Sequence, residues 1–157
     1  MPKKILLLDN IRSSENVGSL FRTADAFGIS EIILIGITPT PIDRFGRPNA
    51  KVAKTALGAE KTITWQSVGT AEEVVLYIRK QKLPLYVLEQ DTKAIPLAKQ
   101  KAQAWALVLG NEVNGVSDYL LQQADIIFEI PMQGEKESLN VSVAGGIALH
   151  QLVESSK

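Results

Sequence analysis

Three polar segments of the 157-residue sequence combine glycines with side chains that could bind or orient a polar ligand. In the first segment, Asn16, which could cap the following helix, and Gly18 precede Arg22. A guanidinium can bind a phosphate through two parallel hydrogen bonds, and Gly18 lies one helical turn before Arg22 on the same side. The pattern predicts an arginine directed into a cleft with room for a phosphate or ribose. A solvated arginine beside an incidental glycine is the alternative.

The other two segments each follow an apolar run. Residues 109–116 place three polar side chains, among them Glu112, between two glycines. Glycine permits positive φ angles and close approach of the backbone to a ligand. Residues 130–144 contain Ser138, which could cap the last helix, and Asn140, expected in its first turn. Taken singly, an ordinary β–α turn and an ordinary capped helix would account for these segments.

Strands and helices alternate along the chain and decide where these segments lie. Short runs rich in Val, Ile and Leu predict strands at Ile5–Leu8, Ile32–Ile35, Thr62–Trp65, Leu85–Leu88, Trp105–Leu109 and Ile126–Ile130. Apolar residues at helical spacing predict helices from Val17 to Gly28 and over 49–57, Ala71–Gln81 and Ser138–Glu154. The alternation is typical of an α/β domain with a mostly parallel, six-stranded sheet, which binds ligands at the carboxyl ends of its strands.

Several familiar signatures are absent from the sequence. No GxGxxG follows a predicted strand, and GxxxxGK[ST], GxSxG and HExxH do not occur. A phosphate-receiver domain would need an acidic cluster after the first strand and an aspartate after the third, where residues 65–67 read Trp-Gln-Ser. The chain has no cysteine and one histidine, His150, so thiol chemistry, zinc–thiolate sites and a His-rich metal site are excluded.

Length and charge bound the class of protein further. Residues 1–157 fit one domain, and no apolar run approaches the ~20 residues of a membrane span, so we expect a cytoplasmic protein without a membrane segment. The 17 basic and 17 acidic side chains are unevenly distributed. Residues 1–103 carry 15 basic and 10 acidic side chains, and residues 104–157 carry 2 and 7. This asymmetry favours a polyanionic partner for the first part, with a chance distribution as the alternative.

In order and spacing, the three segments resemble the three motifs of the SpoU/TrmH family of RNA ribose 2′-O-methyltransferases, in the SPOUT superfamily. The matching stretches are Asn16-x-Gly18-x-x-x-Arg22, Leu109-Gly110-Asn111-Glu112-x-x-Gly115, Ile130-Pro131-Met132 and Ser138-Leu139-Asn140-Val141-Ser142. The resemblance implies a C-terminal trefoil knot, S-adenosylmethionine bound in the knot, and a homodimer with the site at its interface. Gly145 and Gly146 in the apolar last helix would then allow another backbone to pack very closely.

The resemblance also implies residue roles. Arg22 corresponds to the catalytic residue, Asn16 shapes its pocket, and Glu112, Ser138 and Asn140 are further matched site positions. Because a guanidinium has a pKa above ~12, we expect Arg22 to stabilise the developing alkoxide rather than to act as a base. Glu112 would hold Arg22 or Asn16. The implied cofactor contacts are Leu88, Gly110, Ile130, Ser138 and Leu139.

Many relatives carry a separate RNA-binding domain or basic extensions, which residues 1–157 lack. We therefore expect the domain itself to bind RNA beside Arg22, through Arg12, Arg44, Arg47, Lys51 and Lys54. The motifs do not distinguish tRNA from rRNA, and we slightly favour tRNA. Two alternatives stay open: an RNA- or cofactor-binding module without catalysis, and a small-molecule enzyme of the same α/β class. The presence of Arg22 and Asn140 weighs against the first, and the basic excess of residues 1–103 against the second.

Overall fold

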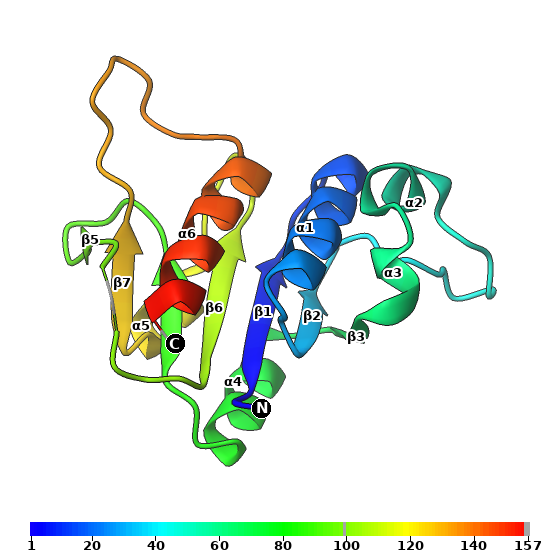
Figure 1. Cartoon of the computed structure of the whole chain (residues 1–157), viewed down its shortest axis with the longest axis horizontal. Helices are drawn as coiled ribbons and strands as arrows, with labels where there is room; N and C mark the ends of the chain where they lie inside the picture. The colour runs from blue at the N-terminus through cyan, green and yellow to red at the C-terminus, as the bar shows by residue number, and fades with distance from the viewer. Residues whose placement is uncertain (99, 156–157) are drawn as a thin grey trace.

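The computed structural model describes residues 1–98 and 100–155. Their strands form one parallel sheet in the order β3-β2-β1-β6-β4-β7-β5 (Figure 1). The strands are β1 (Lys4–Asp9), β2 (Glu31–Ile35), β3 (Thr64–Val68), β4 (Leu85–Leu88), β5 (Ile95–Pro96), β6 (Trp105–Gly110) and β7 (Ile126–Glu129). The predicted α/β architecture is confirmed. The sheet has seven strands rather than six because the two-residue β5 pairs with β7 at the edge.

Helices cover both faces of the sheet (Figure 1). They are α1 (Ser14–Ala26), α2 (Ala50–Ala56), α3 (Ala59–Thr62), α4 (Ala71–Lys80), α5 (Asp118–Gln123) and α6 (Val141–Ser155). Side chains alternate between the faces of a strand, so Leu6 and Leu8 of β1 join the core under α1, α2, α3 and α6. Ile5 and Leu7 join the core under α4 and α5.

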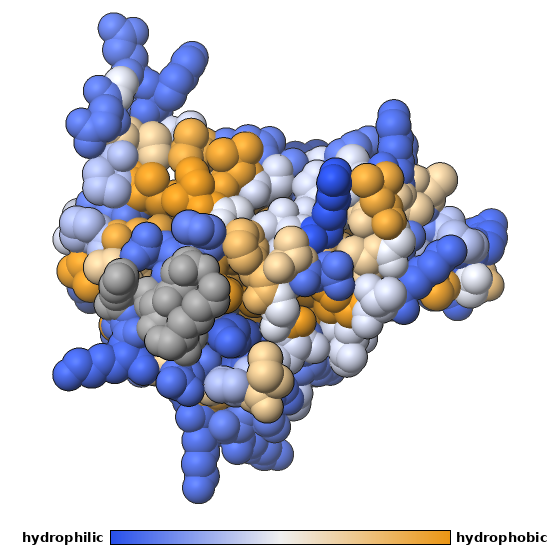
Figure 2. All heavy atoms as spheres, viewed as in Figure 1, coloured by the Kyte–Doolittle hydropathy of each residue, from blue (hydrophilic) through white to orange (hydrophobic). Residues whose placement is uncertain are grey.

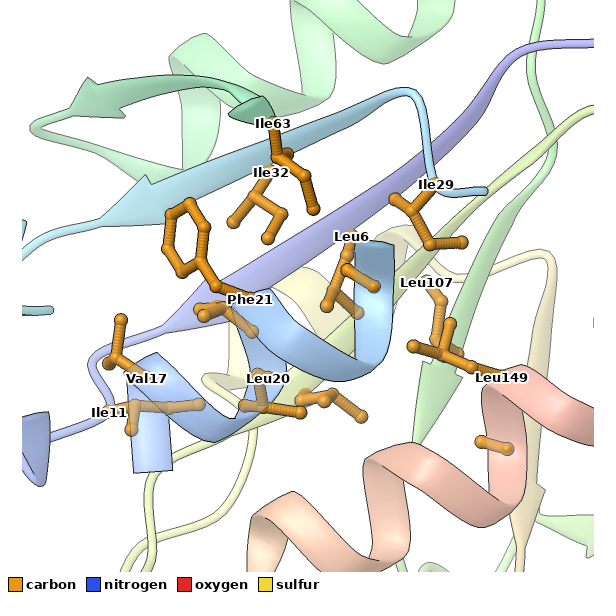
Figure 3. Close-up of a cluster of buried hydrophobic side chains, with 14 of the residues drawn as sticks. Leu6, Ile11, Val17, Leu20, Phe21, Ile29, Ile32, Ile63, Leu107 and Leu149 are labelled. Carbon is orange, nitrogen blue, oxygen red and sulfur yellow. The ribbon is translucent and has the colours of Figure 1, made fainter. Parts of the chain in front are cut away.

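The core under α1 joins the segments that carry the site motifs. Phe21 of α1 points toward Ile32 of the sheet, and Leu149 of α6 lies beside Leu107 of β6 (Figure 3). Leu20 and Leu6 belong to the same buried cluster. These side chains are fully buried, and burial of each contributes roughly 1.5–3 kcal/mol. The first and last long helices are therefore held against the same strands.

Several element boundaries differ from the prediction, and two short helices were not predicted. β3 begins at Thr64 rather than Thr62, because residues 59–62 form the short helix α3 after Gly58, whose φ is +96°. α6 begins at Val141 rather than Ser138. The helix α5 was not predicted, since it spans six residues and buries only Leu120. The predicted end of α1 is confirmed, with Gly28 at a φ of +68°.

Gly18 brings α1 close to α2. A Cβ atom at this position would overlap the Thr55 hydroxyl and the carbonyl oxygen of Val52. The Thr55 hydroxyl also donates to the carbonyl of Glu15 at 2.8 Å, across the same helix pair. The expectation that Gly18 clears space above Arg22 is therefore wrong, because the missing side chain lets two helices meet.

Gly145 has a similar role on α6. A Cβ atom there would lie 2.7 Å from methyl carbons of both Leu109 and Leu20, much closer than the usual ~3.5–4.0 Å between non-bonded carbons. The neighbours of Gly145 are side chains of β6 and α1, so the prediction of a closely packed backbone is wrong within this chain. Gly146 meets Thr23 at an ordinary distance of 3.8 Å.

Candidate active site

A cavity of about 380 Å³ opens at the carboxyl ends of β4, β6 and β7. This is where parallel sheets bind ligands, and the volume lies within the usual range for small-molecule sites. Three chain segments form its walls: the end of β4, the loop after β6, and the segment from β7 into α6. All the cofactor contacts implied by the family resemblance line it: Leu88, Gly110, Ile130, Ser138 and Leu139.

The cavity wall is acidic. Glu112, a predicted site residue, lines it together with Glu89 and Glu129, which sequence reasoning missed. β4 and β7 are paired with Leu88 opposite Phe128, so Glu89 and Glu129 are the next opposed pair. Their positions at two strand ends were the signal that could have identified them. Among the described residues that line the cavity, none is Lys, Arg or His.

The loop after β6 forms a compact turn over Gly110. Asn111 and Gly115 are joined by two backbone hydrogen bonds of 3.0 and 2.9 Å. The Asn111 side-chain oxygen accepts from the N–H groups of Val113 and Asn114 at 2.8 and 2.9 Å. Gly115 has a φ of +71°, a conformation that favours glycine. Both glycines shape this segment as predicted. Gly115 does so through its positive φ angle, and Gly110 does so because the loop backbone packs directly against it.

Two carboxylates from the strands on either side of β6 anchor the end of this loop. Oε2 of Glu89, after β4, accepts from the N–H of Val116 at 2.8 Å. Oδ2 of the buried Asp9, at the end of β1, accepts from the N–H of Ser117 at 2.7 Å. A hydrogen bond to a charged acceptor is worth more than one between neutral groups. The loop is therefore held in place on the sheet that carries the cavity.

Glu112 joins this loop to the start of α1. Its two carboxylate oxygens accept from the backbone N–H groups of Arg12 and Ser13 at 2.9 and 3.0 Å, and from Nδ2 of Asn16 at 3.2 Å. Partial burial raises the pKa of Glu112, but these hydrogen bonds outweigh it and hold the pKa below its ordinary value of 4.5. Of the two partners expected for Glu112, the structure shows Asn16.

Replacing Glu112 by glutamine should weaken the fold at neutral pH by roughly 1 kcal/mol, a modest loss because the side chain is exposed. The lowered pKa means that ionised Glu112 stabilises the protein above pH 4.5, and that this contribution is lost as the pH falls through the folded-state pKa. The difference between wild type and Glu112→Gln should therefore vanish in acid. Urea unfolding across a pH series measures it, with the exposed Glu137→Gln as control. Equal stabilities at neutral pH would contradict the prediction.

Asn16 and Asn140 link the first and third motifs. Nδ2 of Asn140 donates to Oδ1 of Asn16 at 3.3 Å, while Asn16 donates to Glu112. Oδ1 of Asn140 also accepts from the N–H groups of Ser142 and Val143, so Asn140, rather than Ser138, caps α6. Asn16 is likewise not the cap of α1, because the Ser13 hydroxyl accepts its N–H at 3.1 Å. The Asn16 side chain and Nδ2 of Asn140 thus remain available to form a polar chain across all three motifs.

Arg22 lies outside the cavity of its own chain. It is exposed on α1 and lines a second hollow, together with Thr55, Lys54 and Leu57. Asn16 contacts the cavity wall, and Arg22 follows it by six residues, about 9 Å farther along the helix axis. The structure therefore brings together Asn16, Glu112, Ser138 and Asn140, but it separates Arg22 from them and joins it to Lys54.

The residues expected to bind RNA are exposed and fall on two segments, of which only Lys54 shares a hollow with Arg22. Arg12 precedes α1, and the others lie on the loop before α2 or on α2 itself: Arg44, Arg47, Lys51 and Lys54. Arg47 pairs with Asp43 through a 3.0 Å contact. Figure 1 shows this loop and α2 at the end of the molecule opposite β5 and β7.

Residues 1–98 and 100–155 contain neither a candidate metal site nor a candidate membrane-spanning helix. That part of the chain has no group of three or more His, Asp or Glu side chains placed to hold a metal ion. It also has no helix with the length and apolar character needed to cross a membrane.

A parallel α/β sheet with a cavity at the carboxyl ends of its strands is an architecture that binds nucleotides and cofactors. The model of the SpoU rRNA methylase family matches residues 3–150, and the chain therefore belongs to this family.

Curated relatives resemble most of the chain. It is 34% identical over 149 residues to the "23S rRNA (guanosine-2'-O-)-methyltransferase RlmB" of Xylella fastidiosa (strain 9a5c), an alignment that covers 95% of this chain and 57% of the relative. A Borreliella burgdorferi protein named "Uncharacterized tRNA/rRNA methyltransferase" is 31% identical, with 94% and 62% covered. The chain thus spans little more than half the length of the curated relatives it matches.

Solved structures share the fold. An AdoMet-bound rRNA methyltransferase from Sinorhizobium meliloti superposes with a TM-score of 0.82 at 27% identity, covering 95% of this chain and 55% of that one. The A. aeolicus TrmH/SpoU tRNA modifying enzyme superposes with a TM-score of 0.84 at 24% identity, covering 99% and 76%.

Proposed function

We propose that this chain is a methyltransferase domain that transfers a methyl group from S-adenosylmethionine to a ribose 2′-hydroxyl of RNA. The observation that carries the proposal is the cavity at the ends of β4, β6 and β7. Every cofactor position implied by the motifs lines this cavity. Glu112 and Asn140, which also line it, form hydrogen bonds with Asn16 of the first motif. Membership of the SpoU family supports the same activity.

The cavity suits S-adenosylmethionine in charge and shape. Glu89, Glu112 and Glu129 make the wall negative, which favours a ligand bearing a sulfonium and an ammonium group. Gly110 lets the loop backbone close against the cavity, since a Cβ atom there would overlap the N–H of Val116. The bound cofactor supplies an activated methyl group. The AdoMet-bound relative from Sinorhizobium meliloti supports this assignment.

Arg22 is proposed to act on the RNA. Its guanidinium can bind a phosphate next to the target ribose and so position the 2′-hydroxyl. It can also stabilise the alkoxide that develops as the hydroxyl loses its proton. Lys54, which lines the same hollow, adds a second positive charge for the RNA backbone. Glu112 and Asn140 act through Asn16 and are positioning residues in this scheme.

A homodimer would complete the site, and we propose that Arg22 faces the cavity of the partner chain. Two observations support this arrangement: Arg22 does not line its own cavity, and α6 exposes an apolar face. Val143 and Ile147, one helical turn apart, are 52% and 43% exposed. Figure 2 shows apolar side chains gathered over the first turns of α6.

We also propose the C-terminal trefoil knot. Its support is that the segment between β7 and α6 lines the same cavity as the loops after β4 and β6. The long loop that leads from β7 to α6 projects beyond the sheet in Figure 1. Three segments distant in sequence thus share one small volume, as a threaded chain would require.

The proposed substrate is a guanosine ribose of 23S rRNA, and the proposed compartment is the cytoplasm. The Xylella fastidiosa relative is named for methylation of guanosine in 23S rRNA, and the matched family model is that of the SpoU rRNA methylases. These relatives outweigh the slight preference for tRNA drawn from the sequence.

Methyl transfer from labelled S-adenosylmethionine tests the proposal directly. With chelator present, calorimetry should give about one cofactor bound per chain, and incubation with unmodified 23S rRNA should yield labelled 2′-O-methylguanosine on nucleoside analysis. Total tRNA serves as the comparison substrate. Label on tRNA alone would overturn the choice of substrate. Cofactor binding without transfer to either RNA would indicate a binding module, and absence of cofactor binding would remove the cofactor assignment.

A further inference from the structure

An exposed aromatic ring stands between two arginines on the loop before α2. The Phe45 side chain is 67% exposed, although a phenyl ring in water is costly. Cζ of Arg44 lies 4.8 Å from the centre of the ring, and Cζ of Arg47 lies 5.0 Å from it. Both distances are within the ~6 Å range of cation–π attraction. The tip of this loop therefore presents one π-face group and two permanent cations together.

The loop is held in one shape by Asp43. Oδ1 of Asp43 accepts from the N–H groups of both Phe45 and Arg47 at 2.9 Å, and Oδ2 accepts from Nε of Arg47 at 3.0 Å. The N–H of Asp43 donates to the carbonyl of Arg47 at 2.9 Å, and Ile42 and Pro48 form an antiparallel bridge below. Phe45 is thus displayed by a closed hairpin-like loop, which lowers the entropy cost of binding a ligand there.

The guanidinium groups leave room on the ring. Phe45 keeps 67% of its surface exposed with both guanidinium groups beside it. An arginine that covers part of a ring face can turn aside to a flanking phosphate when a base stacks there. The single acidic side chain of the loop tip, Asp43, already binds backbone and Arg47. Lys51 and Lys54 of the following helix add further exposed positive charge. In Figure 2, hydrophilic and hydrophobic spheres lie side by side where Figure 1 places this loop.

We propose that Phe45 is a stacking platform for an unpaired base of the RNA substrate, with Arg44 and Arg47 bound to the flanking phosphates. The inference rests on the proposed function in taking RNA as the ligand. Bases stack on exposed aromatic side chains regardless of sequence, and cations beside the ring hold the backbone. A base-paired strand keeps its bases stacked inside the duplex, so the platform selects single-stranded loops or bulges near the methylated ribose.

The charge of the surface favours RNA over a protein partner. The Phe45 ring stands between Arg44 and Arg47, and the exposed Lys51 and Lys54 follow on α2, whereas the centre of a protein interface is depleted in charge. If the loop instead bound a neighbouring ribosomal protein, replacing Phe45 should not affect the binding of single-stranded and duplex RNA differently.

Binding of a labelled single-stranded oligoribonucleotide, and of the same strand in a duplex, tests the proposal. Phe45→Leu keeps an apolar side chain but removes the π face, and it should weaken single-strand binding about tenfold with little effect on the duplex. Phe45→Trp should restore the affinity. The salt dependence should be unchanged in both variants, whereas replacing Arg44 and Arg47 by Gln should make the log–log salt slope shallower by about 1.4.

The matched control is Leu76→Ala, because Leu76 is 64% exposed on α4, on the other face of the sheet. It should leave both affinities unchanged. Equal losses for single strand and duplex in Phe45→Leu, or no loss for either, would overturn the inference while leaving the proposed methyltransferase intact. If the wild-type chain binds cofactor but neither RNA, the proposed function fails together with the platform.

Discussion

Replacing Arg22 by alanine should lower methyl transfer by at least about a hundredfold, the usual cost of removing one group that stabilises a developing oxyanion. Binding of S-adenosylmethionine should hardly change, because Arg22 does not line the cavity. Arg22→Lys should fail as well, since an ammonium cannot make the planar two-point contact with a phosphate. Single-turnover methylation and cofactor calorimetry measure the two effects. Lys80→Ala, which changes an exposed cation on α4, serves as the control.

The dimer proposal makes the Arg22 result more specific. A chain with Arg22→Ala keeps an intact cavity, and a chain with a damaged cavity keeps an intact Arg22. If Arg22 serves the partner's cavity, co-expression of these two variant chains should recover roughly a quarter of wild-type activity. Half of the dimers would then contain one chain of each kind, and each such dimer would have one working site. No recovery in dimers detected by sedimentation would mean that Arg22 acts within its own chain. Full activity of Arg22→Ala would remove the residue from the mechanism.

Replacing Gly110 by alanine should weaken S-adenosylmethionine binding by roughly 5- to 150-fold, and it supplies the damaged cavity for that mixture. A Cβ atom at Gly110 would overlap the backbone of Gly115 and the N–H of Val116. Such overpacking costs about 1–3 kcal/mol and would displace the cavity wall. Calorimetry measures the affinity, and thermal unfolding shows whether the variant remains folded.

A matched glycine lies in the loop between β7 and α6. A Cβ atom at Gly134 would meet nothing within 4 Å, so Gly134→Ala should bind the cofactor as the wild type does. If Gly110→Ala behaves like Gly134→Ala, the close approach of the loop to β6 is not needed for the cofactor. If both variants lose affinity, the segment between β7 and α6 tolerates an added methyl group less well than the open space around Gly134 indicates.

Local signals in the sequence were sufficient for the sheet and its long helices. The continuous apolar runs of β1, β2 and β6 are fully buried, as strands covered on both faces should be. The short elements were missed because their signals are weaker than those of their surroundings. Residues 59–62 make one helical turn after a glycine, and β5 has only two residues and exists because β7 is beside it.

For the site, the order and spacing of the motifs identified the residues around the cavity but not their contacts. Asn140 rather than Ser138 caps α6, and Ser13 rather than Asn16 caps α1. In each case two polar residues within one turn could serve as the cap, and local propensity does not choose between them. The packing of α1 and α6 against the same sheet selects which residue caps each helix, because it places Asn16 and Asn140 within hydrogen-bond distance of one another.

The sequence by itself determined the parallel α/β class, the family and several of the polar residues around the cavity, because periodicity, strand hydrophobicity and motif spacing are local properties of the chain. Only the tertiary structure decided which of these residues meet. It joined Glu112 to Asn16 and Asn16 to Asn140, and it separated Arg22 from all three. It also gave Gly18 and Gly145 their roles in helix packing. These outcomes depend on contacts between residues roughly 35 to 125 positions apart, which are set by how the helices pack on the sheet rather than by local sequence.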